Sequence, residues 1–270
     1  MDDSNFQEMA HPEGFDYESG SPHLKHTALR DRIAESLRLS IRDLVLGQGS
    51  CRVLEVGAGH GDFTDVMLGA GAEVVVTEMS GPSAGLLSAR YEANDRVTVV
   101  HDPDGQWLAE SDEEFGLVAC LSVLHHIPDY LGFLRQAFEA TQPGGAFISW
   151  QDPLWYPRRT TLNLTLDKAS YFGWRVTKGS YARGALTRVR RLRGVYDESN
   201  PADMSEYHVV RQGVDEEAIV DLAARHFGSV ELIKYWSTQS RLLHDVGSRS
   251  GHVTTFGILA SGRSGPDVTG

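Results

Sequence analysis

The chain has 270 residues, of which 41% are hydrophobic and 23% charged, and its formal net charge is −12. These values are ordinary for a globular α/β chain and exclude collagen-like, disulfide-scaffold and wholly disordered classes. No stretch approaches the ~20 apolar residues of a membrane-spanning helix, and the polar segment Met1–Ala10 is not typical of a secretory signal. Because the two cysteines, Cys51 and Cys120, both lie in apolar runs, we expect no disulfide framework, no metal site and a cytoplasmic protein.

The first part of the chain alternates between helical and extended patterns. Ser21 precedes Pro22 as a helix start, and apolar side chains follow at helical spacing, which predicts an amphipathic helix at residues 22–46 ended by Gly47-Gln48-Gly49. The predicted strands that follow are Cys51–Val56, Glu73–Thr77, Val97–Val100, Leu117–Leu121 and Ala146–Trp150. The predicted helices between them are Asp62–Leu68, Ala84–Ala93, Asp104–Glu110 and Tyr130–Thr141. Apolar strands that alternate with helices favour a doubly wound, mostly parallel sheet.

The second part begins where this alternation stops. Residues 151–212 are rich in aromatic and basic side chains and have no clean strand period. A predicted helix, Asp215–His226, and two predicted strands, Val230–Tyr235 and Val253–Ala260, follow, with a long loop at residues 237–252. We therefore divide the chain into an N-terminal segment and helix (1–46), an α/β core (47–150), an insertion (151–212), the rest of the core (213–260) and a flexible tail (261–270).

Positive charge gathers in one segment. Residues 158–193 have a net charge of +9, which leaves −21 on the remainder. The basic run Arg183–Arg193 has three interpretations: a solvated face or intramolecular partner of the acidic remainder, a site for an acidic substrate, or an RNA-binding surface. The overall charge argues against nucleic acid as a partner.

The most informative motif runs from Val53 to Phe63. An apolar strand enters a turn with glycines at 57, 59 and 61, and the turn opens a helix at Asp62, as at the ligand crevice of a doubly wound sheet. A dinucleotide fingerprint would place its third glycine at Asp62, and an acid there would repel a pyrophosphate at the helix N-terminus. Glu55, just before the turn, suits a cationic ligand, or alternatively caps the turn without touching one.

Further motifs follow at regular spacing. Glu78 ends the next strand, 21 residues after Gly57, and Asp102 follows the third strand. The fourth strand leads into Leu124-His125-His126-Ile127-Pro128, and Pro143-Gly144-Gly145 precedes the fifth. Together these segments resemble the class I S-adenosylmethionine-dependent methyltransferases of the small-molecule type, strongly over residues 50–150. One departure is Gly116, where many members carry Asp.

The resemblance implies a seven-stranded sheet with an antiparallel last strand and S-adenosylmethionine as cofactor. It implies that Glu78 binds the two ribose hydroxyls, that Met79 lines the adenine and that Asp102 accepts from the adenine amino group. The full set of candidate cofactor residues is Glu55, Gly57, Ala58, Gly59, Gly61, Glu78, Met79, Asp102, Leu121 and, closing from the N-terminal segment, Tyr17. Asp102 is alternatively a plain turn residue.

Methyl transfer to a hydroxyl or amine needs an aligned acceptor and a proton acceptor. Candidate bases are His23, His26, His126 and His208, and we take His126 and His208 as catalytic candidates, although His125 and His126 are alternatively structural. The resemblance implies that residues 47–150 form the cofactor-binding core, residues 1–46 a cap and residues 151–212 a substrate lid. The acceptor pocket is expected to use His23, Trp155 and Tyr171, although many aromatic side chains of residues 151–212 are alternatively the lid's own core.

The resulting hypothesis is a methyltransferase acting on a hydroxyl of a small secondary metabolite. The alternatives are methylation of nitrogen or carbon, methylation of RNA or protein, and a methyltransferase fold used for cyclisation or ligand binding. The sequence leaves the oligomeric state open, a homodimer included.

Overall fold

The computed structural model describes residues 21–167, 170 and 212–265. Expectations for Tyr17, Tyr171, His208, the basic run Arg183–Arg193 and the end of the tail lie outside these residues. Among the described residues, no helix is both long and apolar enough to cross a membrane.

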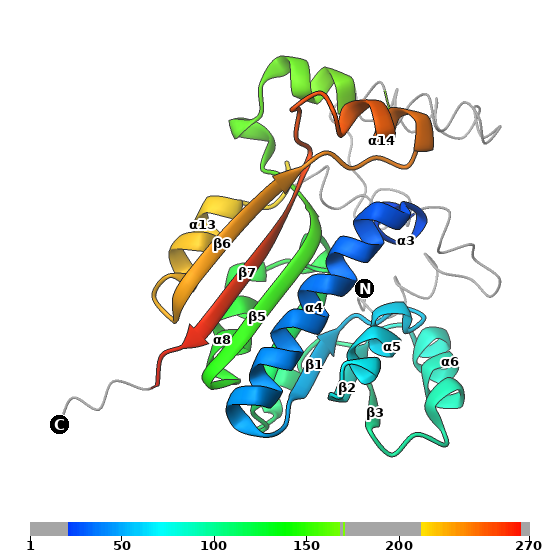
Figure 1. Cartoon of the computed structure of the whole chain (residues 1–270), viewed down its shortest axis with the longest axis vertical. Helices are drawn as coiled ribbons and strands as arrows, with labels where there is room; N and C mark the ends of the chain where they lie inside the picture. Colours follow the sequence, from blue (N-terminus) through cyan, green and yellow to red (C-terminus); the bar gives the residue numbers. More distant parts are fainter. Residues whose placement is uncertain (1–20, 168–169, 171–211, 266–270) are drawn as a thin grey trace.

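A seven-stranded sheet forms the centre of the molecule, in the order β3-β2-β1-β4-β5-β7-β6 (Figure 1). The strands are β1 (Arg52–Val56), β2 (Glu73–Glu78), β3 (Val97–His101), β4 (Phe115–Leu121), β5 (Thr141–Pro153), β6 (Phe227–Tyr235) and β7 (Thr255–Arg263). Strands β1 to β5 pair in parallel, whereas β7 is antiparallel to both β5 and β6. This confirms the predicted doubly wound sheet and its antiparallel last strand.

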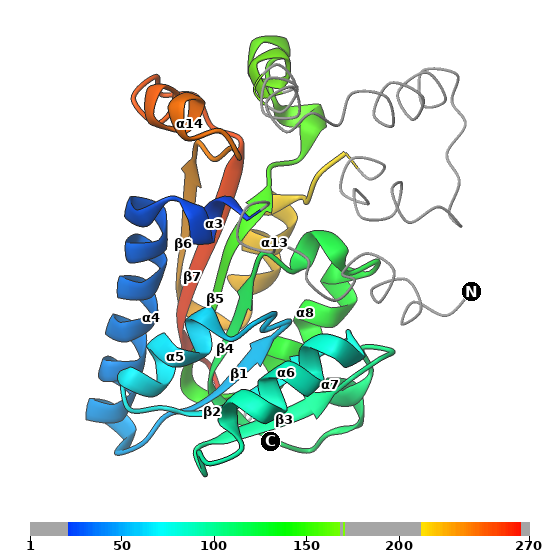
Figure 2. The ribbon, with the colours of Figure 1, turned by 90° about the vertical axis from the view of Figure 1, so that its right-hand side faces the viewer.

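Helices cover both faces of the sheet (Figure 2). The α-helices are α3 (Pro22–Lys25), α4 (Thr27–Gln48), α5 (Asp62–Gly69), α6 (Gly81–Tyr91), α7 (Trp107–Glu110), α8 (Tyr130–Glu139), α13 (Glu216–Ala223) and α14 (Arg241–Gly247), and the short helices η1 (Leu124–His126) and η2 (Tyr156–Arg158) complete the set. Successive β1 residues Val53 and Leu54 enter different core clusters, because neighbouring strand residues point to opposite faces. One cluster includes side chains of α4, α5 and α6, and the other includes side chains of α7, α8 and α13.

The predicted helix at residues 22–46 is interrupted in the structure, and it ends two residues later, within the predicted stop at Gly47–Gly49. The backbone of His26 is extended (φ −96°, ψ 104°) and separates α3 from α4. In this conformation the His26 ring forms a hydrogen bond with the backbone carbonyl of the distant Thr238. At the other end α4 runs through Gly47 and stops at Gly49, whose left-handed φ of 85° ends the helix.

Several further elements differ from the predictions in their presence or bounds. The loop at residues 237–252 contains α14, which Ser240 caps by accepting from the backbone of Leu243. The helix expected from Asp104 begins only at Trp107, after the left-handed turn residue Gly105 (φ 68°). Strand β5 extends from Thr141 to Pro153 and thus takes in the Pro-Gly-Gly segment, and β7 continues past Ala260 to Arg263.

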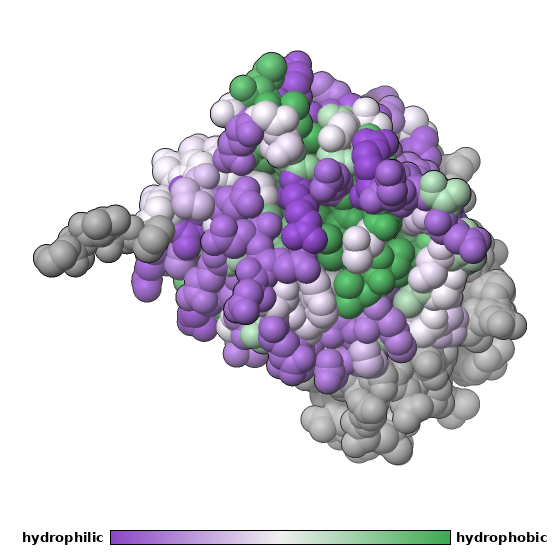
Figure 3. Space-filling view, turned by 90° about the horizontal axis from the view of Figure 1, so that it is seen from below, coloured by the Kyte–Doolittle hydropathy of each residue, from purple (hydrophilic) through white to green (hydrophobic). Residues whose placement is uncertain are grey.

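The face at the opposite end from the carboxyl edge of β1 to β5 is mostly hydrophilic. Figure 3 shows it from below, with a smaller hydrophobic area among polar side chains. This agrees with the abundance of charged residues in the chain.

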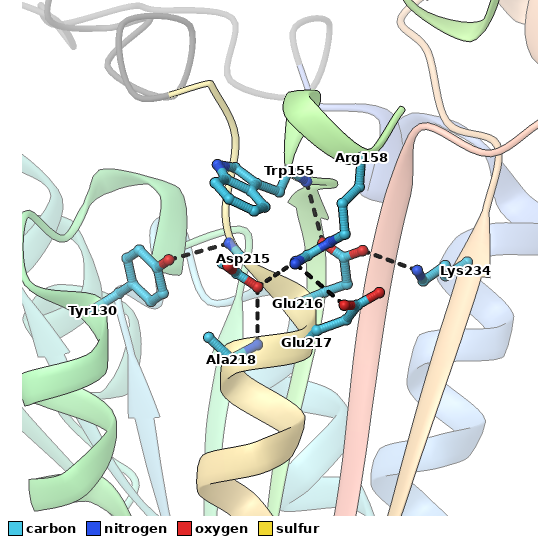
Figure 4. A network of polar contacts seen from close by, with 8 residues as sticks. All are labelled: Tyr130, Trp155, Arg158, Asp215, Glu216, Glu217, Ala218 and Lys234. Carbon is cyan, nitrogen blue, oxygen red and sulfur yellow. Dashed lines mark hydrogen bonds and ion pairs between the residues drawn. The ribbon is translucent and has the colours of Figure 1, made fainter. Parts of the chain in front are cut away.

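An ionic network joins the residues that follow β5 to the start of α13 (Figure 4). Glu216 is 1% exposed and accepts hydrogen bonds from Lys234 (2.9 Å), the Trp155 backbone (3.2 Å) and Arg158 (3.3 Å). Arg158 also pairs with Asp215, which caps α13. Burial opposes ionisation of Glu216, but the hydrogen bonds outweigh it and lower the pKa of this carboxyl.

We predict that Glu216→Gln lowers the free energy of unfolding at pH 7 by about 1–3 kcal/mol, because it leaves buried donors without their charged acceptor. Since the folded protein depresses the Glu216 pKa below 4.5, this difference should close as the pH falls below that value. Urea unfolding at pH 7 and pH 4 measures it. The matched control is Glu217→Gln, because Glu217 pairs with the same Arg158 but is 58% exposed, and its effect should be under about 1 kcal/mol. Equal losses in the two variants would contradict the prediction.

Candidate functional site

The candidate site lies at the carboxyl edge of β1 and β4. Strand β1 lies between β2 and β4 in the sheet, so the chain's connections leave β1 and β4 in opposite directions. Doubly wound sheets bind ligands in the crevice that this reversal opens. The turn after β1, the loop after β2 and η1 after β4 all meet at this edge.

The turn after β1 depends on glycine. Gly57, Gly59 and Gly61 have φ values of 67°, 57° and 85°, a region that side chains with a Cβ rarely adopt. A Cβ on Gly57 would also lie 2.8 Å from a methyl carbon of Val123, and one on Gly61 would lie 2.6 Å from the Tyr91 hydroxyl. The positive φ values agree with the sharp bend expected of these glycines, and close approach of a ligand to their backbone stays a prediction.

Glu78 connects this turn to the next loop. One carboxylate oxygen accepts from the Gly59 backbone N–H and the other from the Ser80 backbone N–H, each at 3.0 Å. Burial raises the pKa of Glu78, and these hydrogen bonds oppose the rise. Because a carboxylate has about four acceptor positions, Glu78 keeps capacity for two ligand hydroxyls.

Glu55 lies beneath the turn rather than at its rim. Its side chain is 2% exposed and accepts a 2.5 Å hydrogen bond from the Thr64 hydroxyl of α5. Burial raises the pKa of Glu55 to about 8, and the nearby acids Asp62 and Asp65 add to the rise. These contacts support the alternative in which Glu55 braces the turn, and a direct ligand contact stays a prediction.

The other candidate cofactor residues surround the same crevice. Leu121 ends β4 and is buried, and Met79 is half-buried directly after β2. Asp102 follows β3, is 8% exposed and accepts from the Trp107 backbone N–H at 3.2 Å. Asp102 therefore acts as a turn residue, which is one of its two predicted roles. Its contact with adenine stays a prediction.

A buried histidine–aspartate pair lies on the other side of the crevice. The Nδ1 atom of His125 lies 2.8 Å from Oδ1 of Asp152, and the His125 backbone N–H donates to the same oxygen at 3.1 Å. Asp152 is fully buried, and its Oδ2 has no hydrogen-bond partner among the described residues. Burial raises the pKa of Asp152 to about 8 and lowers that of His125 to about 3. Between these values the pair carries no net charge and holds one proton, whichever partner carries it.

A β-bulge in β5 orients the Asp152 side chain towards His125. Along β5, Trp150 pairs with Gly257 but Asp152 pairs with the adjacent Phe256, so Gln151 is an extra residue. Gln151 has a φ of 72° and is held by hydrogen bonds with Tyr235 and Ser237. Without the bulge, Asp152 would point to the same face as Trp150, away from His125.

Sequence reasoning missed the Asp152 partnership. The predicted fifth strand ended at Trp150, and the bulge depends on contacts with β6 and β7. The one available signal was an acid close behind an apolar strand at the carboxyl edge. Of the two neighbouring histidines, His125 binds Asp152, whereas His126 is exposed and lies against the His125 ring at 4.0 Å. The contacts favour His125, and the role of His126 stays a prediction.

The remaining candidates lie apart in two groups. His23 is buried on α3, where its ring stacks on Phe63 at 6.1 Å, and His26 is buried between α3 and α4. Trp155 lies in the network of Figure 4, with the Arg158 guanidinium 4.6 Å from its ring. A search of the described residues finds no cluster of three or more His, Cys, Asp or Glu side chains suited to a metal ion.

Comparisons with known proteins point to one family. A family described as "Methyltransferase domain" matches residues 23–181. The chain is 30% identical over 215 residues to a 27-O-demethylrifamycin SV methyltransferase of Amycolatopsis mediterranei, which covers 76% of this chain and 72% of that protein. It is also 30% identical over 110 residues to a ubiquinone biosynthesis O-methyltransferase of Aromatoleum aromaticum, which covers 40% of this chain. The match spans about half of that relative's length (47%).

The solved structures agree in fold. The plantazolicin methyltransferase BpumL in complex with SAH superposes with a TM-score of 0.54 over 96% of this chain and 95% of its own, at 8% identity. At that identity the likeness concerns the fold alone.

The buried pair yields a prediction about stability and pH. Because folding raises the Asp152 pKa from 3.8 to about 8, ionisation favours the unfolded state across this window. Asp152→Asn cannot ionise, so wild type should lose stability relative to this variant by about 1 kcal/mol per pH unit between pH 4 and pH 8. Urea unfolding of both proteins at four pH values measures the difference. Parallel stability curves would show that Asp152 is not held in its protonated form.

Proposed function

The chain belongs to the class I S-adenosylmethionine-dependent methyltransferases, and on that premise we propose that it transfers a methyl group from S-adenosylmethionine to a hydroxyl of a small organic molecule. This proposal rests on one observation, that two groups of polar residues lie at the same edge of the sheet. Glu78 and the glycine turn lie on one side of the crevice, and the His125–Asp152 pair follows the next strand, β4.

The residues of the turn fit this cofactor better than a dinucleotide. Glu78 lies at the crevice, Asp62 and Asp65 lie in the first turn of α5, where Asp65 pairs with Arg90, and Glu55 is buried beneath the glycine turn. Such a set opposes the phosphates of a dinucleotide and favours a cationic ligand. When bound, S-adenosylmethionine supplies an electrophilic methyl group on a positively charged sulfur. In the proposal, Glu78 binds the ribose, Met79, Asp102 and Leu121 hold the adenine, and the turn accommodates the amino-acid end.

The His125–Asp152 pair supplies the proton acceptor. The hydrogen bond between Asp152 and Nδ1 of His125 fixes the ring and assigns Nε2 to the acceptor hydroxyl, and Asp152 accepts from Nδ1–H once it has lost its own proton. Asp152 also stabilises the imidazolium that forms when the proton moves to Nε2. The pair is a stronger base once Asp152 has lost its proton, so turnover should rise with pH up to about 8. An acid–base pair of this kind suits a hydroxyl acceptor, and the O-methyltransferase names of the relatives add support. A secondary metabolite as acceptor is supported by the rifamycin relative.

We predict that Glu78→Ala weakens S-adenosylhomocysteine binding by about 1–3 kcal/mol, because two charge-assisted hydrogen bonds are lost. Isothermal titration calorimetry measures the change. The matched control is Glu73→Ala, which removes an exposed acid at the start of the same strand. Equal affinity of the Glu78 variant and wild type would place the ribose elsewhere.

The assignment of the base is tested by two neighbouring substitutions. We expect His125→Ala to lower kcat by 10²-fold or more and His126→Ala to have the smaller effect, because only His125 is oriented by Asp152. The assay follows S-adenosylhomocysteine formed from a panel of phenolic acceptors between pH 6 and pH 9. A larger loss in the His126 variant, or a His125 variant that keeps the wild-type rate and pH profile, would contradict the assignment.

A further inference from the structure

His23 is a buried polar side chain whose hydrogen bonding is incomplete. It is 4% exposed, and among the described residues its Nδ1 atom has no hydrogen-bond partner. Its ring stacks on that of Phe63, nearly parallel at an angle of 20°. A buried polar atom left without a partner costs about 1–3 kcal/mol, so its retention calls for a reason.

The helix that carries His23 is held firmly in place. The neighbouring His26 ring bonds the Thr238 carbonyl at 2.6 Å and stacks on the His244 ring at 3.7 Å. Lys25 donates to the Gln239 carbonyl at 2.7 Å. These contacts tie α3 to the connection between β6 and α14, at the carboxyl edge of β5 (Figure 2). These contacts fix the position of the short helix that carries His23.

His23 also lies close to the other functional elements. Its stacking partner Phe63 is the second residue of α5, directly after the glycine turn. A positive charge on His23 would lower the pKa of His125, so the two rings lie within electrostatic range of each other. His23 is therefore near both the glycine turn, through Phe63, and the proposed base.

We propose that His23 binds a second polar group of the acceptor, next to the hydroxyl that His125 deprotonates. This inference rests on the proposed function and narrows it to acceptors that carry two adjacent hydrogen-bonding groups. The flat ring stack of His23 and Phe63 beside these groups suits an aromatic acceptor.

The chemistry of His23 limits what that second group is. Burial lowers the pKa of His23 to about 4, so the ring is neutral at physiological pH. A neutral imidazole offers one N–H donor and one lone pair, which suits a hydroxyl or a carbonyl. A carboxylate or phosphate would require a charged ring, which the burial disfavours. The proposed second group is therefore uncharged.

The test compares catechol, which has two adjacent hydroxyls, with phenol, which has one. Calorimetry first establishes S-adenosylhomocysteine binding, and then measures both probes against that complex. Wild type should bind catechol about 10-fold more tightly than phenol, since one buried hydrogen bond is at stake. His23→Phe keeps an aromatic ring on Phe63 but removes Nδ1, and it should abolish the difference. His23→Asn restores a polar group near the Nδ1 position and should recover part of it.

The outcomes separate the inference from the proposed function. Catechol that binds no better than phenol, or a difference that persists in His23→Phe, would overturn the role of His23 while cofactor binding stands. Weaker S-adenosylhomocysteine binding in His23→Phe would make His23 a cofactor residue and equally overturn it. Absence of S-adenosylhomocysteine binding to wild type would instead refute the proposed function.

Discussion

The Glu78 carboxylate is the interaction on which the candidate site depends. It accepts from the backbone of Gly59 and of Ser80 and so joins the turn after β1 to the start of α6. Ser80 in turn caps α6 by accepting from the Ser83 backbone N–H. A buried carboxylate is costly unless it is hydrogen-bonded, and these two donors supply that compensation without using all of its acceptor positions. The same contacts that fix the turn therefore leave Glu78 able to bind a ligand.

Electrostatics decides between the two ligands that a glycine turn of this kind can hold. A pyrophosphate would meet Asp62 at the N-terminus of α5, where Asp65 is already paired with Arg90, and would lie above the buried Glu55. Burial is the main cause of the raised pKa of about 8 at Glu55, and repulsion from Asp62, Asp65 and Glu78 adds to it. A ligand that carries positive charge relieves this repulsion, whereas one that carries phosphate adds to it. The acidic turn and the family membership thus support the same class of cofactor.

The sequence was sufficient wherever local pattern decides the structure. The strands, the glycine turn and the helix after it follow from apolar spacing and from positions that only glycine tolerates. The sequence was insufficient where contacts with distant residues override the local preference for helix or strand. The break at His26 depends on Thr238 and His244, and α14 packs on Trp236 so closely that Gly247 has no room for a side chain. The bulge at Gln151, which turns Asp152 towards His125, depends on Tyr235 in the same way.

A crystal structure of the protein with S-adenosylhomocysteine bound is the most direct test of the central claim. The account predicts that both ribose hydroxyls lie within hydrogen-bond distance of Glu78, and that the sulfur faces the side of the crevice occupied by His125. The same compound bound with its ribose away from Glu78, or an empty crevice beside the glycine turn, would contradict it.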